Sequence, residues 1–442
     1  MPFRPDQQTA APGRVVGAAS PAVAADLPAD LPAAVPAEPS RLSRLLLFGA
    51  LVAIGPLTID IYLAAFPAVV DDLATTEAIV QLTLTATFVG LATGQLLIGA
   101  VSDAVGRRRP LLAALSAYVV VSALIAVTTA VPVLLGLRFL QGLTAAAGMV
   151  LSQAMVRDLY SGSVMATFIS RLFLIVGVAP IIAPTLGAQF LEFGTWRTIF
   201  WALAVFGLVL VLLALWRVRE TLPPERRAGR GLSPLLASYA VLLRDRRYIG
   251  LVLTACFAMG SLFAYISSAT FVFQDRYGLS TQEYAWVFAA GAGSLTLTSQ
   301  VNGWLVQRFH PAAIVRAALP AGAVVALLLL GASVLDLGVA AIIAGVVALM
   351  AVVGFVMPNN PVLALADHGE RAGAAAALLG ASSFVFGGVI SPVSGMFEAA
   401  SAVPMAGIMV ACSLTALVTF WTLARPREIL RDLAWDTPRR PG

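Results

Sequence analysis

The chain has 442 residues, of which 59% are hydrophobic and only 12% are charged, whereas a soluble protein carries roughly a quarter of its residues as charged groups. Apolar runs recur along the chain, and most of them reach the roughly 20 residues that span a bilayer, a length that helices of globular cores seldom sustain. These features exclude a soluble globular protein and predict an all-α integral membrane protein surrounded by lipid.

The chain starts with a Pro- and Ala-rich segment, residues 1–40, which carries scattered charge and no apolar run. Such a composition cannot bury a core, so we expect a disordered cytoplasmic tail. The segment lacks the charged start, apolar block and cleavage site of a signal peptide. We therefore expect the first membrane span to serve for targeting.

Twelve apolar segments follow the tail. They cover residues 43–64, 78–101, 110–129, 131–155, 166–190, 197–217, 248–273, 283–306, 312–333, 337–358, 371–396 and 402–424. A polar stretch separates the sixth segment from the seventh, so we expect two six-helix halves, 41–219 and 247–425, joined by a cytoplasmic linker, 220–246, and followed by a cytoplasmic tail, 426–442. Within the linker, the run SPLLASYAVLL predicts a short helix on the membrane surface.

The positions of the basic residues predict the orientation. The chain contains no lysine, and its arginines gather in the even-numbered loops and the linker, whereas the odd-numbered loops hold only Arg197 and Arg276. The positive-inside rule therefore places both termini and the linker in the cytoplasm. The net charge of +5 thus reflects topology, and we expect no nucleic-acid partner.

The two halves show a trace of internal repetition. Gly99, near the end of the second span, is followed four residues later by Asp103, and Gly303, near the end of the eighth span, is followed four residues later by Gln307. Parallel repeats occur in transporters whose substrate sites lie between the halves near the middle of the membrane.

The loop after the second span, GAVSDAVGRRRPL, combines a carboxylate, a glycine turn and three arginines. Arg107 lies one helical turn from Asp103, Gly106 permits a tight bend, and Arg108 helps to fix the loop on the cytoplasmic side. We expect Asp158, at the cytoplasmic end of the fourth span, to join this group. On these residues alone, a simple topology anchor remains an alternative.

The fourth span holds a guanidinium inside an apolar helix. Arg138 keeps its charge and must find acceptors or water, or else extend to the outer interface. Gly142, Ala145 and Gly148 make one side of this helix small, which permits close packing.

The fifth span contains Gly177, Pro180, Pro184 and Gly187 at spacings of three, four and three residues, so they share one helix face. Prolines in a spanning helix remove backbone hydrogen bonds and allow bending. A purely structural kink is the alternative to a moving part.

The first span contains Asp60, whose carboxylate would cost roughly 2.5–3.5 kcal/mol at the centre of a bilayer on insertion scales. Exclusion of water favours its protonated form, and a nearby Arg138 would favour its ionised form. A group pulled in both directions can change protonation when its surroundings change. A carboxylate that faces solvent at a helix end is the alternative.

The second half offers fewer candidates. Asn359 and Asn360 stand between two prolines, where their amides could bind a substrate or satisfy carbonyls that the prolines free; the second role is favoured. The candidate lining of a substrate cavity comprises Tyr62, Gln141, Met149, Tyr265 and Asn360. The two cysteines and two histidines form no metal-ligand pattern, and no nucleotide-binding loop is present, so neither a metal nor a cofactor is expected.

Two stretches match motifs of the major facilitator superfamily. The loop fits G-x-x-x-D-x-x-G-R-R/K at Gly99, Asp103, Gly106, Arg107 and Arg108, and the fourth span fits R-x-x-Q-G at Arg138, Gln141 and Gly142.

A further resemblance is to the Bcr/CflA family of drug resistance transporters within that superfamily. Its first helix usually reads S-x-D-M-Y-L-P-A-L-P, which Asp60, Tyr62, Leu63, Ala65 and Pro67 match and from which Ala64 and Phe66 depart. The stretches RDLY and ETLPPERR are also similar to that family, and the resemblance covers residues 45–425. The fifth span resembles the antiporter motif G-x-x-x-G-P-x-x-G-G of drug exporters, although Ala183 and Ala188 stand where glycine is most usual.

The resemblance implies a monomeric secondary transporter, not an enzyme, in the inner (plasma) membrane of a bacterial cell. It would export a drug-like molecule or an amino acid in exchange for external protons and would need only the proton gradient. Asp60 would bind the proton and Arg138 would modulate it. Asp103 and Arg107 would latch the outward-facing state, and the Gly177–Gly187 face would form a moving wall. A proton-coupled importer of a nutrient or osmolyte on the same fold, a membrane-embedded enzyme and a channel are the alternatives.

Overall fold

The computed structural model describes residues 41–227, 233–395 and 401–424, and every regular element within these ranges is helical. The predicted tails, 1–40 and 426–442, lie outside the described residues. The all-α prediction is therefore confirmed for the part of the chain that is described.

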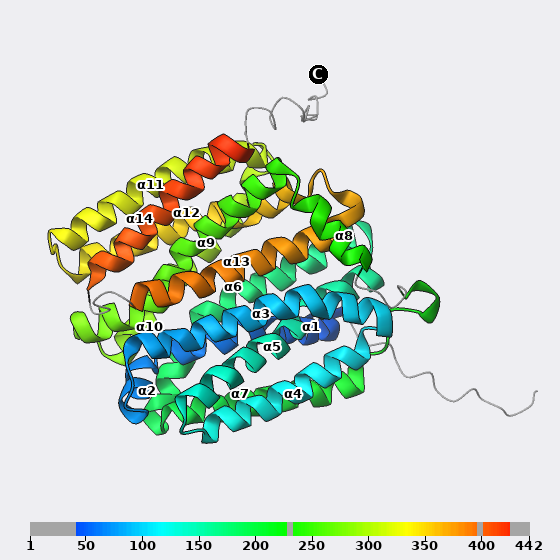
Figure 1. Cartoon of the computed structure of the whole chain (residues 1–442), viewed down its shortest axis with the longest axis horizontal. Helices are drawn as coiled ribbons and strands as arrows, with labels where there is room; N and C mark the ends of the chain where they lie inside the picture. The colour runs from blue at the N-terminus through cyan, green and yellow to red at the C-terminus, as the bar shows by residue number, and fades with distance from the viewer. Residues whose placement is uncertain (1–40, 228–232, 396–400, 425–442) are drawn as a thin grey trace, which may run out of the picture. The chain divides into compact units, whose positions relative to one another are not determined.

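Six long helices form the first half and six form the second (Figure 1). The first six are α1 (Arg41–Leu63), α3 (Glu77–Val105), α4 (Arg108–Val127), α5 (Val131–Leu159), α6 (Gly162–Phe193) and α7 (Trp196–Arg217). The second six are α9 (Arg246–Thr270), α10 (Thr281–Leu305), α11 (Pro311–Val334), α12 (Val339–Leu365), α13 (Ala372–Gly395) and α14 (Ala402–Thr419). The shorter elements are α2 (Phe66–Asp72), α8 (Ser233–Leu242), the turns η1 (Pro224–Arg226) and η3 (Gly369–Arg371), and π-helical turns that continue α9 (η2, Phe271–Arg276) and α14 (η4, Phe420–Ala424).

Eleven of the helices in the described ranges, counted with their continuations, are long and apolar enough to cross a membrane, and α10 is the long helix that falls short. Its sequence carries Thr, Ser, Gln and Asn along much of its length. These residues suit its neighbours α6 and α12, because Ser294 and Ser299 donate to backbone carbonyls of α12 and Thr296 donates to one of α6. The predicted twelve-helix architecture is confirmed, with this one helix more polar than its counterparts.

The predicted spans agree with the helices except at several ends. The largest difference is α12, which was expected to stop at residue 358 but continues to Leu365 through both Pro358 and Pro361. The helix can continue because neighbouring helices compensate for the backbone hydrogen bonds that prolines remove. The linker run SPLLASYAVLL forms α8 as predicted, and α8 packs against α13.

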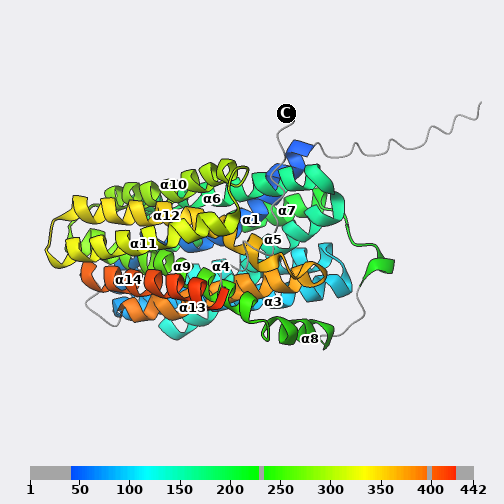
Figure 2. The ribbon, with the colours of Figure 1, turned by 90° about the horizontal axis from the view of Figure 1, so that it is seen from above.

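The two halves repeat the same pattern of helix contacts. In the first half α3 packs on α5, α1 on α6 and α4 on α7, and the corresponding pairs in the second half are α10 on α12, α9 on α13 and α11 on α14. The halves meet through α3 with α13 and through α6 with α10, and these two pairs lie on opposite faces of the bundle (Figure 2). The internal repetition suggested by the sequence is therefore present in the fold.

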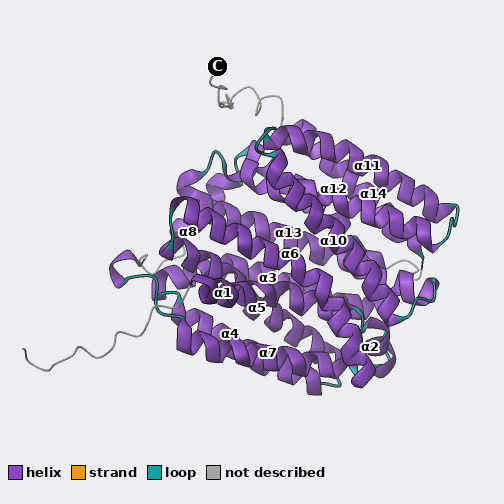
Figure 3. Ribbon diagram, turned by 180° about the vertical axis from the view of Figure 1, so that it is seen from behind, coloured by secondary structure: helices purple, strands orange, loops and turns teal. Residues whose placement is uncertain are grey.

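Small residues let the helices of the first half approach closely. Added Cβ atoms on Gly142 and Gly148 would collide with the backbone carbonyls of Thr87 on α3 and Leu51 on α1. Interfaces of membrane helices are enriched in such residues because they permit backbone contact. The predicted small face of the fourth span is confirmed, and it lets α5 pack against both α1 and α3, which are its neighbours in the bundle (Figure 3).

The halves also touch at the end of the bundle where α1 and α9 finish, which the arginine pattern predicts to be external. The Thr270 hydroxyl donates to the Leu63 carbonyl at 3.0 Å, and the rings of Phe66 and Phe271 lie 5.8 Å apart. This end of the interface is therefore closed. The opposite end carries the loop between α3 and α4.

Candidate functional site

Asp60 lies near the end of α1 and is 5% exposed. No hydrogen bond or ion pair to its carboxyl occurs among the described residues. It lies within electrostatic range of Tyr265 on α9 and Tyr284 on α10, so it faces the second half of the molecule. A carboxylate that faces solvent, the alternative from the sequence, is not what the structure shows.

The two tyrosines near Asp60 are fully enclosed. The Tyr265 ring stacks on Phe288 at 5.3 Å, and the Tyr284 ring lies 6.1 Å from Phe288. The buried hydroxyl of Tyr265 has no hydrogen-bond partner among the described residues. A carboxyl and an unpaired hydroxyl therefore share one buried region between the halves.

Arg138 lies in a different environment. Its side chain is fully buried on α5, and its Nη1 donates to the Gln141 side chain at 2.6 Å and to the Thr58 carbonyl at 3.2 Å. The guanidinium carbon lies 4.7 Å from the centre of the Tyr62 ring and 5.5 Å from that of Phe200. Extension of Arg138 to the outer interface, the alternative from the sequence, is not what the structure shows.

The expected proximity of Arg138 to Asp60 is also not found, because no ion pair joins them within the described ranges. Thr58 and Tyr62 lie on one face of α1, four residues apart, and Asp60 is two residues from each. Residues two apart in a helix point in nearly opposite directions, since each residue turns by about 100°. Arg138 therefore contacts the face of α1 that carries Thr58 and Tyr62. The Asp60 side chain projects from the opposite face of the same helix.

A buried polar network supports the Arg138 face. Gln141 donates to the Ser122 hydroxyl at 2.9 Å, and the hydroxyls of Thr58 and Tyr118 are hydrogen-bonded at 2.7 Å. The Nε and Nη2 atoms of Arg138 have no partner among the described residues. Ser122 and Tyr118 were not predicted from the sequence, because a hydroxyl in an apolar helix gives no signal of what it contacts.

The candidate cavity residues do not gather around one cavity. Tyr62 and Gln141 contact Arg138, Met149 lies against Gly55, and Asn360 donates to the Leu251 carbonyl of α9 at 2.7 Å. Of the five candidates, Tyr265 alone lies within electrostatic range of Asp60. A small pocket inside the second half, lined by residues that include Ser261, Leu319, Val352 and Ser413, includes none of them.

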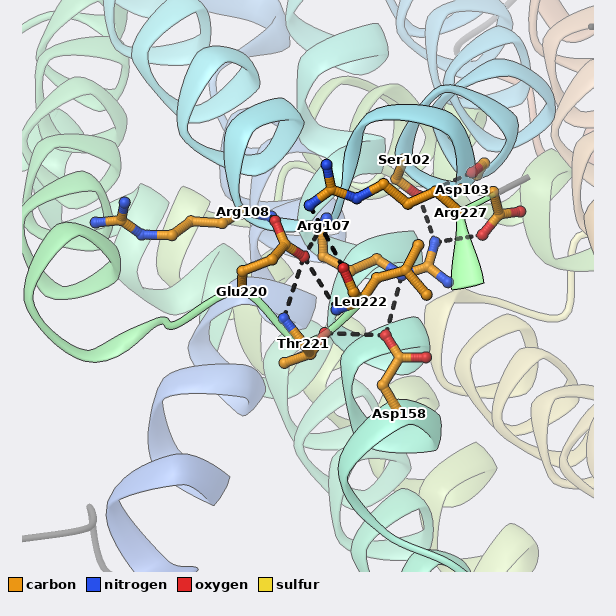
Figure 4. Close-up of polar contacts among 10 residues, drawn as sticks. Ser102, Asp103, Arg107, Arg108, Asp158, Glu220, Thr221, Leu222 and Arg227 are labelled. Carbon is orange, nitrogen blue, oxygen red and sulfur yellow. Dashed lines mark hydrogen bonds and ion pairs between the residues drawn. The ribbon is translucent and has the colours of Figure 1, made fainter. Parts of the chain in front are cut away.

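The loop between α3 and α4 forms a dense polar cluster (Figure 4). Arg107 donates through Nη1 to Asp103 and to the Ser102 hydroxyl, both at 2.6 Å, and through Nε to Asp158 on α5 at 3.1 Å. Arg107 is 8% exposed, although the Asp103 side chain is 48% exposed. One buried cation thus joins the ends of α3 and α5.

A residue that was not predicted completes this cluster. The Glu220 carboxylate accepts the backbone N–H groups of Arg107 at 2.8 Å and Arg108 at 3.2 Å. The Arg108 guanidinium points away from the cluster. It donates to the carbonyl of Leu215 in α7 and to that of Val218, which directly follows this helix. The signal in the sequence is the stretch ETLPPERR, whose resemblance to the Bcr/CflA family gives Glu220 no role by itself. We call Ser102, Asp103, Arg107, Asp158, Glu220 and Thr221 the Arg107 cluster.

The glycine and proline residues of α6 lie between two helices. A Cβ on Gly187 would collide with the Ile61 carbonyl of α1, while the Gly177 carbonyl accepts a hydrogen bond from Thr296 of α10 at 2.8 Å. Pro180 and Pro184 lie between these contacts within an uninterrupted helix. The contacts place Gly187 against its own half and Gly177 against the other half.

Comparisons with known proteins place this geometry in context. A family model described as Major Facilitator Superfamily matches residues 46–392. The chain is 38% identical over 389 residues, covering 88% of this chain and 96% of the relative, to the "Uncharacterized MFS-type transporter YdgK" of Bacillus subtilis (strain 168). It is 27% identical to the "Bicyclomycin resistance protein homolog" of Haemophilus influenzae (86% and 95% covered) and 31% identical to the "Chloramphenicol resistance protein" of Pseudomonas aeruginosa (72% of each covered).

Solved structures share the fold. A bacterial homologue of the human lysosomal transporter Spinster superimposes with a TM-score of 0.69 at 17% identity, covering 89% of this chain and 98% of that one. A D-xylose–proton symporter superimposes with a TM-score of 0.69 at 15% identity, covering 86% and 97%. At these identities the likeness concerns the fold alone.

Proposed function

Because the chain belongs to the Major Facilitator Superfamily, it is a transporter rather than an enzyme, and we propose that it exports a small drug-like molecule in exchange for external protons. The proposal is supported by relatives named for bicyclomycin and chloramphenicol resistance, which favour export over import of a nutrient. We further propose a monomer in a bacterial inner membrane with both termini in the cytoplasm, driven by the proton gradient without a bound cofactor.

The observation that carries the proposal is the position of Asp60. Its carboxyl is buried on α1, has no cation partner among the described residues, and faces Tyr265 and Tyr284 of the other half. A buried carboxyl without a cation is more stable when protonated, and it can ionise when a change of state admits water or substrate. A group between the halves is therefore suited to exchange a proton for a substrate.

The other candidate residues receive narrower proposed roles. Arg138 acts through its contacts with Thr58 and Tyr62 on α1, so it modulates the position of that helix and thereby the environment of Asp60. Asp103, Arg107 and Asp158 form the latch at the cytoplasmic end. The α6 face from Gly177 to Gly187 is the moving wall, since it contacts both halves.

A susceptibility panel tests the proposal. A pump-deficient bacterial host carrying the empty vector, the wild-type gene or Asp60→Asn is exposed to bicyclomycin, chloramphenicol and sulfonamides. The wild-type protein raises the inhibitory concentration of at least one compound, and Asp60→Asn, expressed at the same level in the membrane, does not. Equal resistance from both proteins would contradict the role of Asp60. If no compound separates the wild-type protein from the empty vector, export of these drug classes is contradicted.

A further inference from the structure

The central linker begins inside the Arg107 cluster. Glu220 follows the end of α7 at Arg217 by three residues, and its carboxylate collects four backbone N–H groups (Figure 4). Oε1 accepts from Arg107 at 2.8 Å and from Thr221 and Leu222 at 3.1 Å each, and Oε2 accepts from Arg108 at 3.2 Å. One side chain therefore holds both its own segment and the loop between α3 and α4.

The two bonds from Arg107 and Arg108 take the place of a side-chain cap at the start of α4. Helix α4 begins at Arg108, and the preceding Arg107 makes no side-chain cap. The first N–H groups of a helix have no partner within the helix, and a negative charge at that end is favoured by the helix dipole. Glu220 supplies both the acceptors and the charge from a position 113 residues away from Arg107.

Gly106 makes this approach possible. Its φ angle is +100°, a conformation that glycine adopts at little cost and other residues rarely adopt. A Cβ atom at this position would also collide with the Glu220 carboxylate. The glycine of the loop motif is thus required here both for the turn and for contact with the linker.

Thr221 extends the attachment to a third helix. Its hydroxyl donates to Oδ2 of Asp158 at 2.9 Å, the same oxygen that accepts from Arg107 Nε at 3.1 Å. Asp158 lies at the end of α5. Two consecutive linker residues therefore fasten the ends of α3, α4 and α5 to the segment that leads to the second half.

We propose that Glu220 and Thr221 are positioning residues of the gate, which make the start of the linker a part of the latch. The inference rests on the proposed gating role of Asp103 and Arg107. When the loop between α3 and α4 moves relative to α7, it must either carry the linker with it or break the two hydrogen bonds that the backbone N–H groups of Arg107 and Arg108 donate to the Glu220 carboxylate. The linker attachment therefore sets the balance between the outward-facing and inward-facing states.

The test measures that balance in the full-length protein in membrane vesicles. In a background with the two cysteines, Cys256 and Cys412, replaced by alanine, Thr270→Cys reports opening of the closed outer end. Gln95→Cys reports opening of the inner part of the α3–α13 interface, because the Gln95 side chain lies against Gly380 of α13. Labelling by an impermeant maleimide is measured for each probe in right-side-out and inside-out vesicles. The ratio of outer to inner labelling is the readout.

Glu220→Ala should change this ratio at least about tenfold, because bonds to a charged acceptor are among the stronger ones. Glu220→Gln, which keeps one carbonyl oxygen, should have an intermediate effect. Thr221→Val should change the ratio about threefold in the same direction, as expected for loss of one hydrogen bond, and Thr221→Ser should restore it. Glu225→Ala, which removes an exposed acid of the same linker, is the matched control and should leave the ratio unchanged.

Asp103→Ala is measured in parallel to separate the two proposals. If Asp103→Ala changes the ratio at least about tenfold while Glu220→Ala stays within twofold of the wild-type value, the role of the linker residues is wrong and the latch stands. If Glu220→Ala changes the ratio at least about tenfold and Asp103→Ala stays within twofold, the linker attachment stands and the proposed role of Asp103 is wrong. If neither variant changes the ratio, both proposals are contradicted.

Discussion

The Arg138 guanidinium carbon lies 4.7 Å from the centre of the Tyr62 ring, on the face of α1 that also presents the Thr58 carbonyl. Asp60, between these two residues in the sequence, instead lies near Tyr265 and Tyr284 of the second half. The first half thus keeps a buried cation and a buried carboxyl on different sides of one helix. A rotation or tilt of α1 would change the surroundings of both groups together.

The first prediction concerns this cation. Arg138→Lys should reduce transport at least about tenfold and lower the free energy of unfolding by about 1.5–3 kcal/mol, because an ammonium cannot both stack flat on Tyr62 and bond to the Gln141 side chain and the Thr58 carbonyl. Drug efflux and thermal unfolding in detergent measure the two effects. Arg109→Lys, at an exposed position, is the control. Normal efflux in Arg138→Lys would contradict the prediction and show that transport needs only a positive charge at this position.

A second prediction concerns the latch. Asp103→Ala removes the carboxylate that accepts from Arg107 at 2.6 Å, but Arg107 keeps Asp158 and Ser102 as partners. Because the Asp103 side chain is half exposed, its loss should change stability by no more than about 1 kcal/mol. Membrane insertion should stay normal while most transport is lost. Full efflux at normal expression would remove the gating role of Asp103.

A third prediction concerns α6. Gly187→Val would force a side chain against the Ile61 carbonyl of α1, and overpacking costs roughly 1–3 kcal/mol. Such a cost is enough to bias two states that differ by a few kcal/mol, so the variant should be trapped in one orientation. Cysteine labelling on both sides of the membrane measures this. Gly136→Val, at a site with open space around it, should behave as the wild-type protein, and unchanged labelling in Gly187→Val would contradict the moving wall.

A fourth prediction concerns pH. Burial acts to raise the pKa of the Glu220 carboxyl, but the backbone N–H groups of Arg107, Leu222, Arg108 and Thr221 outweigh it and hold the pKa below its ordinary value. A carboxyl with a lowered pKa stabilises the folded state above its unfolded pKa of about 4.3 and loses that contribution as the pH falls through the folded value.

The difference in melting temperature between the wild-type protein and Glu220→Ala should therefore stay constant from about pH 8 to about pH 5.5 and shrink below about pH 4. Thermal unfolding of both proteins across this range measures it. The linker attachment would then be insensitive to physiological changes of cytoplasmic pH. A difference that already shrinks between pH 8 and pH 6 would contradict this assignment.

Local pattern was sufficient to predict the twelve helices, because a spanning helix must be apolar over its own length. It failed at the end of α12, where two prolines suggested a stop that tertiary packing prevented. The pairing of Arg107 with Asp103 follows from helical spacing, since the two residues are four apart. Glu220 could not be paired with Arg107 from one sequence, because the contact joins residues 113 positions apart.

The partner of Arg138 was also out of reach of the sequence alone, because it too is a contact between different helices. Its need for acceptors follows from its charge, but the choice between Asp60 and the Thr58–Tyr62 face depends on how α1 is rotated against α5. That rotation is determined by close contacts such as Gly148 against the Leu51 carbonyl. The sequence therefore predicted that Arg138 needs acceptors and missed which groups supply them.

The account depends most on Asp60 as the proton site, and proton release from purified protein in detergent tests this directly. Addition of a transported drug to the wild-type protein in weakly buffered solution should release protons, because the substrate displaces the proton from the Asp60 carboxyl. Asp60→Asn should bind the drug but release none, while Asp103→Asn, at the half-exposed latch, should still release them. Undiminished release from Asp60→Asn would contradict the account and place the proton elsewhere, with Glu398, outside the described residues, as the next candidate.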